Sequence, residues 1–170
     1  MGQEEAFTPG DALRNAEILY VDGDSQRGDA LRRMLLSLGV ARVQVVESAK
    51  DAIKVALGTH CNLVIAEYRL PPMDAIQLVR EIRTVVNYPR ALLPVLIVGD
   101  PVSSDIIGAA FEAGANHFMI RPLHASKLYE HIVWALRDSR PFVVKDGHYV
   151  IKLVRPKART AAATHAAATK

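Results

Sequence analysis

Five short apolar runs of β type alternate along the chain with five segments in which apolar residues recur at helical spacing. The apolar runs cover residues 18–21, 43–46, 63–66, 95–98 and 118–120. The helical segments cover residues 30–38, 52–57, 76–85, 106–111 and 128–136. Such an alternation predicts an α/β domain with a parallel sheet and helices on both faces. Residues 63–66 and 95–98 are apolar throughout, as expected of strands covered on both sides.

The positions that follow these runs carry the residues of greatest chemical interest. Asp22, Glu67, Gly99 and Arg121 each come directly after a predicted strand. In open parallel sheets the functional site lies at the carboxyl ends of the strands. We therefore expect these four positions to lie at the same edge of the sheet.

The chain divides into four parts. Residues 1–15 are polar and acidic and are predicted to be a flexible N-terminus, and residues 16–138 form the domain. In residues 139–155, two β-type runs flank the turn signal Asp146-Gly147, which predicts a hairpin or an extended arm. Residues 156–170 are basic and rich in Ala and Thr, without an apolar stripe, and are predicted to be a disordered tail.

Charge is distributed unevenly between these parts. The chain has a net charge of +3. Residues 1–136 hold 13 basic and 16 acidic residues, whereas residues 137–170 hold 8 basic and 2 acidic residues. The basic end of the chain is suited to contact phosphates or an acidic partner, or simply to remain solvated.

Several classes of protein are not indicated by the sequence. With the single cysteine Cys61, expected to be a buried thiol, no internal disulfide or CxxC metal site can form. The six histidines show no metal-ligand spacing. Residues 1–15 do not have the pattern of a signal peptide, and no apolar stretch approaches the ~20 residues of a membrane helix. We expect a cytoplasmic protein without a membrane partner.

Four motifs resemble the response-regulator receiver domains of the chemotaxis-receiver type. Residues 18–24 (ILYVDGD) resemble the first strand and acidic turn, and residues 63–74 (LVIAEYRLPPMD) the phosphoacceptor strand and loop. Residues 94–100 (PVLIVGD) resemble the fourth strand, and residues 113–123 (AGANHFMIRPL) are similar to the stretch that ends in a Lys-Pro pair. The resemblance covers residues 17–138. It implies a doubly wound, flavodoxin-like sheet of strand order 2-1-3-4-5 and a role in phosphorelay (two-component) signal transduction.

The resemblance also implies a chemistry that this chain has largely lost. Working receivers accept a phosphoryl group on an Asp, with help from Mg²⁺, a hydroxyl residue and a Lys. Asp22 matches the first acidic position, but Gly23 stands where a second acid belongs and Glu67 stands at the phosphoacceptor position. Gly99 replaces the hydroxyl residue and Arg121 replaces the Lys. We predict a degenerate, non-enzymatic receiver without a cofactor, with at most weak Mg²⁺ binding through Asp22 and Glu67.

Geometry makes the change at residue 67 matter. The extra methylene of Glu67 moves its carboxylate by on the order of 1 Å, and a misplacement of ~1 Å can cost ~100-fold in a positioned reaction. An Arg can hold a Glu through two hydrogen bonds, so we predict a Glu67–Arg121 pair that locks one signalling conformation. If both groups faced solvent, the pair would contribute only ~0–1 kcal/mol. Asp24 points to the other face from Gly23 and is expected, with Ser25 as the alternative, to cap the first helix.

Phe118 falls where receivers carry an aromatic switch residue, and Gly99 would leave room for its inward position. A permanently packed core aromatic is the alternative. The resemblance places the partner surface on the fourth helix, fifth strand and fifth helix, including Ala109, Phe118, Lys127 and Tyr129. The implied partner is a histidine kinase or a downstream regulator, and a homodimer is a further hypothesis.

The preferred function is a stand-alone receiver that works by protein contact without phosphorylation. Three other functions remain open from the sequence. A receiver that accepts phosphate on Glu67 is the first alternative, and a nucleic-acid regulator acting through its basic C-terminal arm is the second. Because no helix-turn-helix pattern follows the domain, nucleic acid is the less favoured partner. The fold alone does not exclude a small-molecule enzyme.

Overall fold

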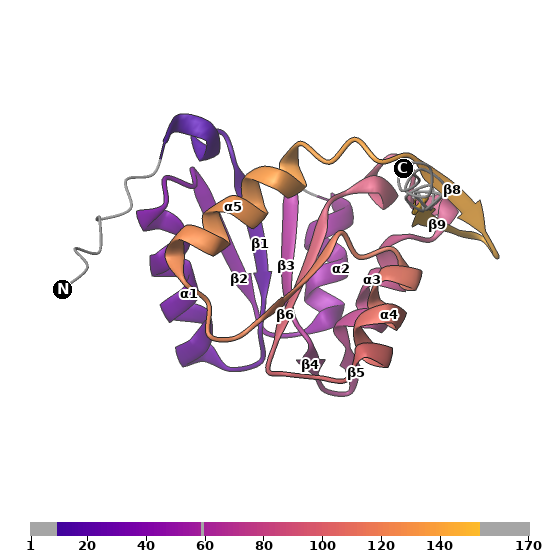
Figure 1. Cartoon of the computed structure of the whole chain (residues 1–170), viewed down its shortest axis with the longest axis horizontal. Helices are drawn as coiled ribbons and strands as arrows, with labels where there is room; N and C mark the ends of the chain where they lie inside the picture. Colours follow the sequence, from indigo (N-terminus) through magenta and orange to yellow (C-terminus); the bar gives the residue numbers. More distant parts are fainter. Residues whose placement is uncertain (1–9, 59, 154–170) are drawn as a thin grey trace, which may run out of the picture.

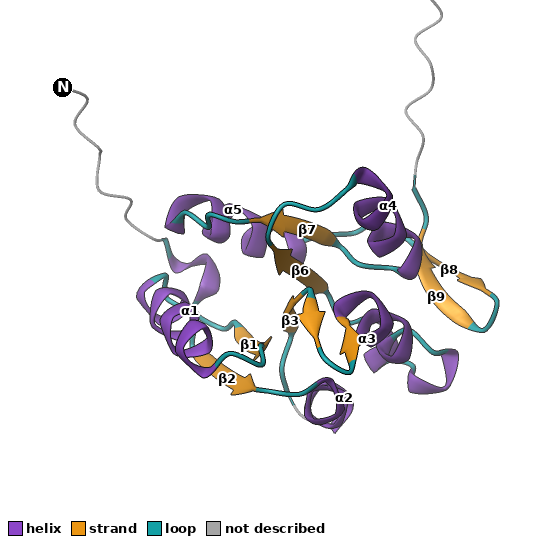
Figure 2. Cartoon of the chain, turned by 90° about the horizontal axis from the view of Figure 1, so that it is seen from below, coloured by secondary structure: helices purple, strands orange, loops and turns teal. Residues whose placement is uncertain are grey.

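In the computed structural model, which describes residues 10–58 and 60–153, five strands form one parallel sheet (Figures 1 and 2). These strands are β1 (Glu17–Val21), β2 (Arg42–Val46), β3 (Leu63–Glu67), β6 (Val95–Gly99) and β7 (His117–Ile120). Their spatial order is β2-β1-β3-β6-β7, and every pairing is parallel. Counted along the chain, this is the order 2-1-3-4-5, so the predicted fold class is confirmed.

Five helices cover the sheet on its two faces. They are α1 (Ser25–Ser37), α2 (Ala49–Gly58), α3 (Ala75–Ile82), α4 (Ser104–Ala113) and α5 (Ala125–Leu136). Figure 2, which looks along the strands, shows α1 and α5 on one side of the sheet and α2, α3 and α4 on the other. Each face therefore buries its own apolar layer, as the doubly wound arrangement requires.

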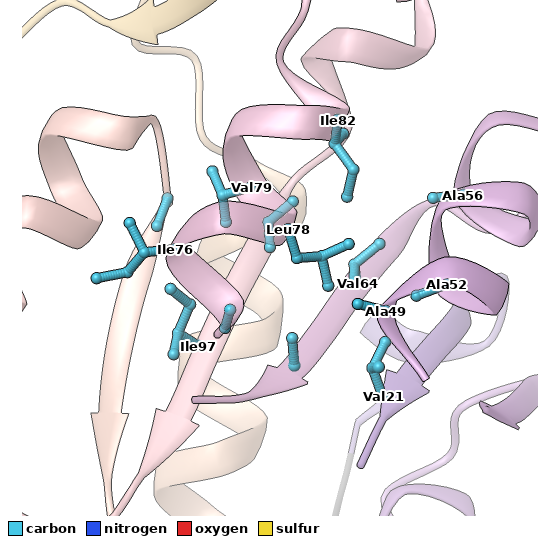
Figure 3. Close-up of a cluster of buried hydrophobic side chains, with 14 of the residues drawn as sticks. Val21, Ala49, Ala52, Ala56, Val64, Ile76, Leu78, Val79, Ile82 and Ile97 are labelled. Atoms are coloured by element: carbon cyan, nitrogen blue, oxygen red, sulfur yellow. The ribbon is translucent and has the colours of Figure 1, made fainter. Parts of the chain in front are cut away.

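The larger apolar layer lies beneath α2, α3 and α4 (Figure 3). Val21, Val64 and Ile97 point into it from three neighbouring strands, and α3 contributes Leu78 and Ile82. The second layer, under α1 and α5, includes Tyr20 and Met119 from the sheet. Alternate residues of one strand thus serve opposite layers, which is why both central strands are apolar throughout.

α3 ends earlier than the apolar spacing predicts. Its start is fixed by a capping box, in which the Gln77 amide donates to the Asp74 carboxylate and the Asp74 amide donates to the Gln77 side chain. The prediction that the helix reaches Val85 is wrong, because Val85 begins the short 3₁₀ helix η2 (Val85–Asn87). The Val85 amide donates to the Gly147 carbonyl at 3.0 Å, so a contact with the C-terminal hairpin replaces a further helical turn.

The N-terminal prediction needs correction where the structure describes it. Asp11–Leu13 form a 3₁₀ helix, η1, and the Leu13 side chain is fully buried in the layer under α1 and α5. The structure places Leu13 in the core, so residues 10–15 pack on the domain that was predicted to begin at residue 16. Residues 1–9 lie outside the described residues, as does the predicted tail at 156–170.

Two hairpins accompany the sheet. The proline loop after β3 contains the short antiparallel pair β4 (Arg69–Leu70) and β5 (Met73–Asp74). The C-terminal hairpin predicted from Asp146-Gly147 is present as β8 (Phe142–Lys145) and β9 (His148–Ile151). Asp146 and Gly147 both have positive φ, at 50° and 78°. In Figure 1 the β8–β9 hairpin and the β4–β5 pair lie at opposite ends of the sheet.

Arg83 anchors the C-terminal hairpin at the amino edge of the sheet, the end where the parallel strands begin. Its side chain is fully buried and makes five hydrogen bonds, to the carbonyls of Ala91, Leu93 and Gly114 and to the Asn116 side chain. The Arg83 carbonyl accepts the Tyr149 amide at 2.8 Å. The Phe142 ring lies 5.0 Å from the guanidinium carbon, in cation–π geometry.

Asn116 extends this contact toward the surface. The side-chain Nδ2 of Asn116 donates to the Asp138 carboxylate, and Asp138 in turn forms an ion pair with Arg140 at 2.7 Å. We call Arg83, Asn116, Asp138 and Arg140 the amino-edge network. The position next to this network, residue 114, requires a glycine. The φ of Gly114 is 102°, and a Cβ there would lie 3.0 Å from the Tyr149 carbonyl oxygen and 3.1 Å from Arg83 Nε.

No helix within residues 10–58 and 60–153 has the length and apolar character needed to cross a membrane.

Candidate functional site

The structure brings the strand-end residues together at the carboxyl edge of the sheet. Asp22 follows β1, Glu67 ends β3, Gly99 ends β6, and Arg121 follows β7. The Arg121 amide donates to the Gly99 carbonyl at 2.9 Å, and the Arg121 guanidinium bonds to the Glu67 carboxylate. The predicted location of the site thus follows from the topology.

Asp22 is fully buried, and its carboxylate is saturated with hydrogen bonds. Oδ2 accepts from the Tyr20 hydroxyl at 2.6 Å and from Arg27 Nε at 2.7 Å. Oδ1 accepts from the Asp24 amide at 2.9 Å and from Arg27 Nη2 at 2.7 Å. Burial alone would raise the pKa of Asp22, but the hydrogen bonds from Arg27, Tyr20 and Asp24 outweigh it and hold the pKa below its ordinary value. Asp22 is therefore ionised at neutral pH.

Arg27 is the functional residue that sequence reasoning missed. Asp24 caps α1, as predicted, by accepting the Arg27 amide at 3.0 Å, and this places Arg27 in the first helical turn. Its side chain then turns back over the end of β1 and forms a two-pronged contact with Asp22. The only sequence signal is a basic residue three positions after the capping Asp24, which is too common to single out.

Glu67 is buried as well, with 4% of its side chain exposed. Arg121 bonds to it through Nη2, and Arg27 Nε lies 3.9 Å from the same carboxylate oxygen. Burial lowers the pKa of Arg121, but its hydrogen bond to Glu67 outweighs this, so the pKa lies above its usual value. The predicted Glu67–Arg121 contact is thus present, with one hydrogen bond from Nη2 instead of the expected two, and Glu67 is not solvent-facing. We call Asp22, Glu67, Arg27 and Arg121 the carboxyl-edge network.

Gly99 leaves space that two aromatic rings occupy. A Cβ at residue 99 would lie 3.1 Å from the Tyr68 Cβ and 3.6 Å from the Phe118 Cζ. The two rings are 5.9 Å apart, and Phe118 is 6% exposed within the layer under α2, α3 and α4. Phe118 therefore takes the inward position for which Gly99 makes room.

The site does not fit a divalent metal in this arrangement. Mg²⁺ takes oxygen ligands at ~2.0–2.1 Å, and a carboxylate oxygen has two lone pairs. Both lone pairs of each Asp22 oxygen are engaged by donors, and Gly23 adds no carboxylate. Nor does any cluster of three or more His, Cys, Asp or Glu side chains suited to a metal occur in the described part of the chain.

The residues predicted for the partner surface do not share one face. Phe118 is buried in one apolar layer, while Tyr129 packs against the other and its hydroxyl lies beside Gly10. Only Lys127 of the predicted set is fully exposed, and Ala109 is half-buried. The resemblance fixed the elements but not which way the side chains of β7 and α5 point.

A different set of side chains crosses α4, β7 and α5, and we call it the aromatic row. It consists of Phe111, His117, His131 and Trp134. The His117 ring lies 6.4 Å from Phe111, 4.4 Å from His131 and 6.0 Å from Trp134. Trp134 is 44% exposed, and Arg140 stacks on it at 4.9 Å. Together with Tyr129 and Arg137, these two side chains line a surface pocket of about 540 Å³ at the end of α5.

Comparison with known proteins agrees with this fold. The model of the response regulator receiver domain matches residues 18–133. The response regulator protein FleR of Pseudomonas aeruginosa is 32% identical over 132 residues, which are 78% of this chain and 27% of FleR. The chain thus spans about a quarter of the length of FleR. The chemotaxis protein CheY-3 of Vibrio cholerae is 26% identical over 70% of this chain and 90% of its own length.

Solved structures share the arrangement of the sheet and helices. A response regulator structure from Chloroflexus aurantiacus superposes with a TM-score of 0.66 at 24% identity, over 73% of this chain and 99% of that one. A receiver-domain protein from Methanospirillum hungatei gives 0.63 at 22% identity, over 72% and 94%. At these identities the likeness concerns the fold.

Proposed function

The chain belongs to the family of response regulator receiver domains, and we propose that it works in two-component signalling by protein contact, without phosphoryl transfer. The observation that carries this proposal is the state of Glu67. Its carboxylate is buried at the phosphoacceptor position and already bonded to Arg121. A receiver whose acceptor is permanently paired has no free nucleophile to offer a phosphodonor.

Charge supports the same conclusion. In a phosphoryl-accepting site the cations neutralise charge that develops on the transferred group. Here Arg121 and Arg27 neutralise Glu67 and Asp22 in the resting protein. A phosphoryl group at residue 67 would have to break these contacts and would carry its added negative charge into a site without a spare cation.

The missing hydroxyl points the same way. Tyr68 and Phe118 fill the space beside Gly99, so the contact that a Ser or Thr would make with a phosphoryl oxygen has no counterpart. Removing a single preorganised donor from a comparable oxyanion site costs ~10²–10³ in rate. Phe118 is already inward, so no phosphorylation is needed to move it there.

For the protein contact we propose the aromatic row and its exposed end at Trp134. Trp, other aromatic side chains and Arg are enriched in the cores of protein interfaces. Trp134, stacked on Arg140 beside a surface pocket, has that character, and it lies on α5, within the elements that the family resemblance assigns to partners. The partner class is a histidine kinase or a downstream regulator.

The test of phosphorylation independence uses the wild-type chain. The protein is incubated with acetyl phosphate and Mg²⁺, and separately with beryllofluoride and Mg²⁺, beside an active receiver as positive control. We expect no mass increase and no shift of the amide signals of Glu67, Gly99 and Arg121. A stable phospho-adduct at Glu67 would contradict the proposal and would favour the phosphoryl-accepting alternative.

The interaction surface has its own test once a kinase or regulator partner binds. Trp134→Ala should weaken that binding by about 30-fold or more, since truncation of a central aromatic anchor costs ~2 kcal/mol or more. Lys54→Ala, an exposed change on α2, outside the proposed surface, serves as control and should have little effect. If the two variants bound the partner with equal affinity, Trp134 would not belong to the interface and the proposed surface would be wrong.

A further inference from the structure

Arg27 holds the position that a cation shared by Asp22 and Glu67 would take. Its Nε lies 2.7 Å from Asp22 Oδ2 and 3.9 Å from Glu67 Oε2. Nη2 reaches the second Asp22 oxygen at 2.7 Å, and Nη1 lies 3.9 Å from Asp24 Oδ2. One guanidinium thus faces three carboxylates at the carboxyl edge of the sheet.

We propose that Arg27 is a built-in replacement for the divalent cation of this pocket, which makes the site metal-independent. The inference rests on the proposed function and deepens it, because it names what excludes the metal. Arg27 and Arg121 together balance the two buried carboxylates, so no unpaired buried charge is left for a divalent ion, and the further carboxylates near these arginines, Asp24 and Asp100, are exposed.

Crowding by atoms other than Arg27 does not explain the exclusion. Gly23 is exposed, and a Cβ built on it would meet only the Glu47 carbonyl, at 3.7 Å. Asp24 is half-exposed beside the pocket. Oxygen ligands and space are therefore at hand, and the guanidinium takes up the lone pairs of Asp22 that a metal would use.

This assignment predicts that removal of Arg27 opens a metal site. In Arg27→Gln, Asp22 keeps its contacts with Tyr20 and Asp24 but loses its counter-charge, and one lone pair on each oxygen becomes free. Mn²⁺ should then bind and selectively broaden the amide signals of residues 22–24 and 67. Excess Mg²⁺ should reverse the broadening by competition, because both ions favour carboxylate and water ligands.

Two variants and the wild type provide the matched controls. Arg33→Gln removes an exposed arginine of the same helix and should behave as the wild type, without selective broadening at the pocket. The double variant Asp22→Asn/Arg27→Gln lacks the central carboxylate and should lose the gained binding. Should Arg27→Gln be unfolded without metal, Mg²⁺ must restore its helical circular dichroism by neutralising Asp22.

Each outcome decides the proposal. Selective Mn²⁺ binding by the wild type, no gain in folded Arg27→Gln, or an unfolded variant that Mg²⁺ does not rescue would overturn the role of Arg27. These failures differ from failure of the proposed function. A metal-free phospho-adduct of the wild type would contradict phosphorylation independence, yet leave the role of Arg27 intact.

Discussion

Arginines hold side chains together at both edges of the sheet, but the groups that they bind differ between the two edges. In the carboxyl-edge network, Arg27 and Arg121 face the side-chain carboxylates of Asp22 and Glu67. In the amino-edge network, Arg83 is surrounded by the carbonyls of Ala91, Leu93 and Gly114 and by Asn116. Within the described residues, the ion pairs of the amino edge are confined to its surface end, at Asp138 and Arg140.

The difference suggests different roles for the two edges. The carboxyl edge has the chemistry of a functional site, whereas the amino edge has the chemistry of a structural anchor. Carboxylates can titrate, bind metals or accept a phosphoryl group, whereas backbone carbonyls can only accept hydrogen bonds. Burial lowers the pKa of Arg83 to about 9, a sign of how much water its charge has given up. Gly114 closes α4, so its carbonyl also carries the partial negative charge of a helix end, which favours a cation.

The amino edge should yield the largest loss of stability. Arg83→Met keeps the apolar stem but removes the guanidinium donor from the carbonyls of Ala91, Leu93 and Gly114 and releases the cation–π contact with Phe142. Unmet buried acceptors and lost packing together should reduce the free energy of unfolding by about 3–5 kcal/mol. Urea denaturation measures this loss, and hydrogen exchange at the Tyr149 amide reports whether the hairpin detaches.

Arg80→Met, an exposed change on the same helix, is the matched control and should stay within about 0.5 kcal/mol of the wild type. Arg121→Met extends the comparison to the other edge. It should cost less than Arg83→Met because Arg121 is partly exposed and Arg27 remains 3.9 Å from Glu67. A larger loss in the free energy of unfolding for Arg121→Met than for Arg83→Met would contradict the assignment of the amino edge as the structural anchor.

The stability contributed by Asp22 at the carboxyl edge should depend on pH in acid, whereas that contributed by Arg83 at the amino edge should not. Asp22→Asn removes the negative charge from the two-pronged contact between Asp22 and Arg27 and should cost about 2–3 kcal/mol at pH 7. The pKa of Asp22 in the folded protein lies below its ordinary value of 3.8, so the unfolded chain takes up the proton first. The contribution of Asp22 is therefore complete above about pH 4 and is lost as the pH falls through the folded pKa.

Urea denaturation at pH 7, 5 and 3 tests this difference. The gap between wild type and Asp22→Asn should narrow between pH 5 and 3, whereas the gap for Arg83→Met should stay constant. A gap for Asp22→Asn that does not narrow would mean that hydrogen bonds, rather than the carboxylate charge, hold Arg27 in place.

The same contrast explains what sequence reasoning could reach. The meeting of Asp22, Glu67, Gly99 and Arg121 at one edge follows from periodicity and topology, whereas the strand order and the Glu67–Arg121 contact were implied by the family resemblance. The contacts of Arg27 and Arg83 could not be predicted from the sequence, because their partners are set by tertiary geometry. Arg27 turns back across a helix cap, and Arg83 binds carbonyls that no residue type announces. Tyr129 was misplaced for a related reason, since helical spacing does not tell which layer a side chain joins.

A small effect near neutral pH should complete the comparison. His117, at the amino end of β7, stacks on His131 of α5. Burial lowers the pKa of both rings, and the charges of His131 and Arg140 lower that of His117 further. Lys127 also lowers the pKa of His131, against an opposing effect of Glu130. Since both folded pKa values lie below 6.5, the unfolded chain protonates first, and stability falls as the pH drops below about 6.5.

His131→Gln should therefore flatten the fall in Tm between pH 7 and 5. The effect should stay below about 1 kcal/mol, because both rings keep part of their surface in water. His124→Gln, an exposed change at the start of the same helix, is the control and should leave the slope unchanged. Histidine ring titration by NMR checks the cause directly. Ring pKa values at or above 6.5 for both residues would mean that His117 and His131 do not cause a fall in stability near neutral pH.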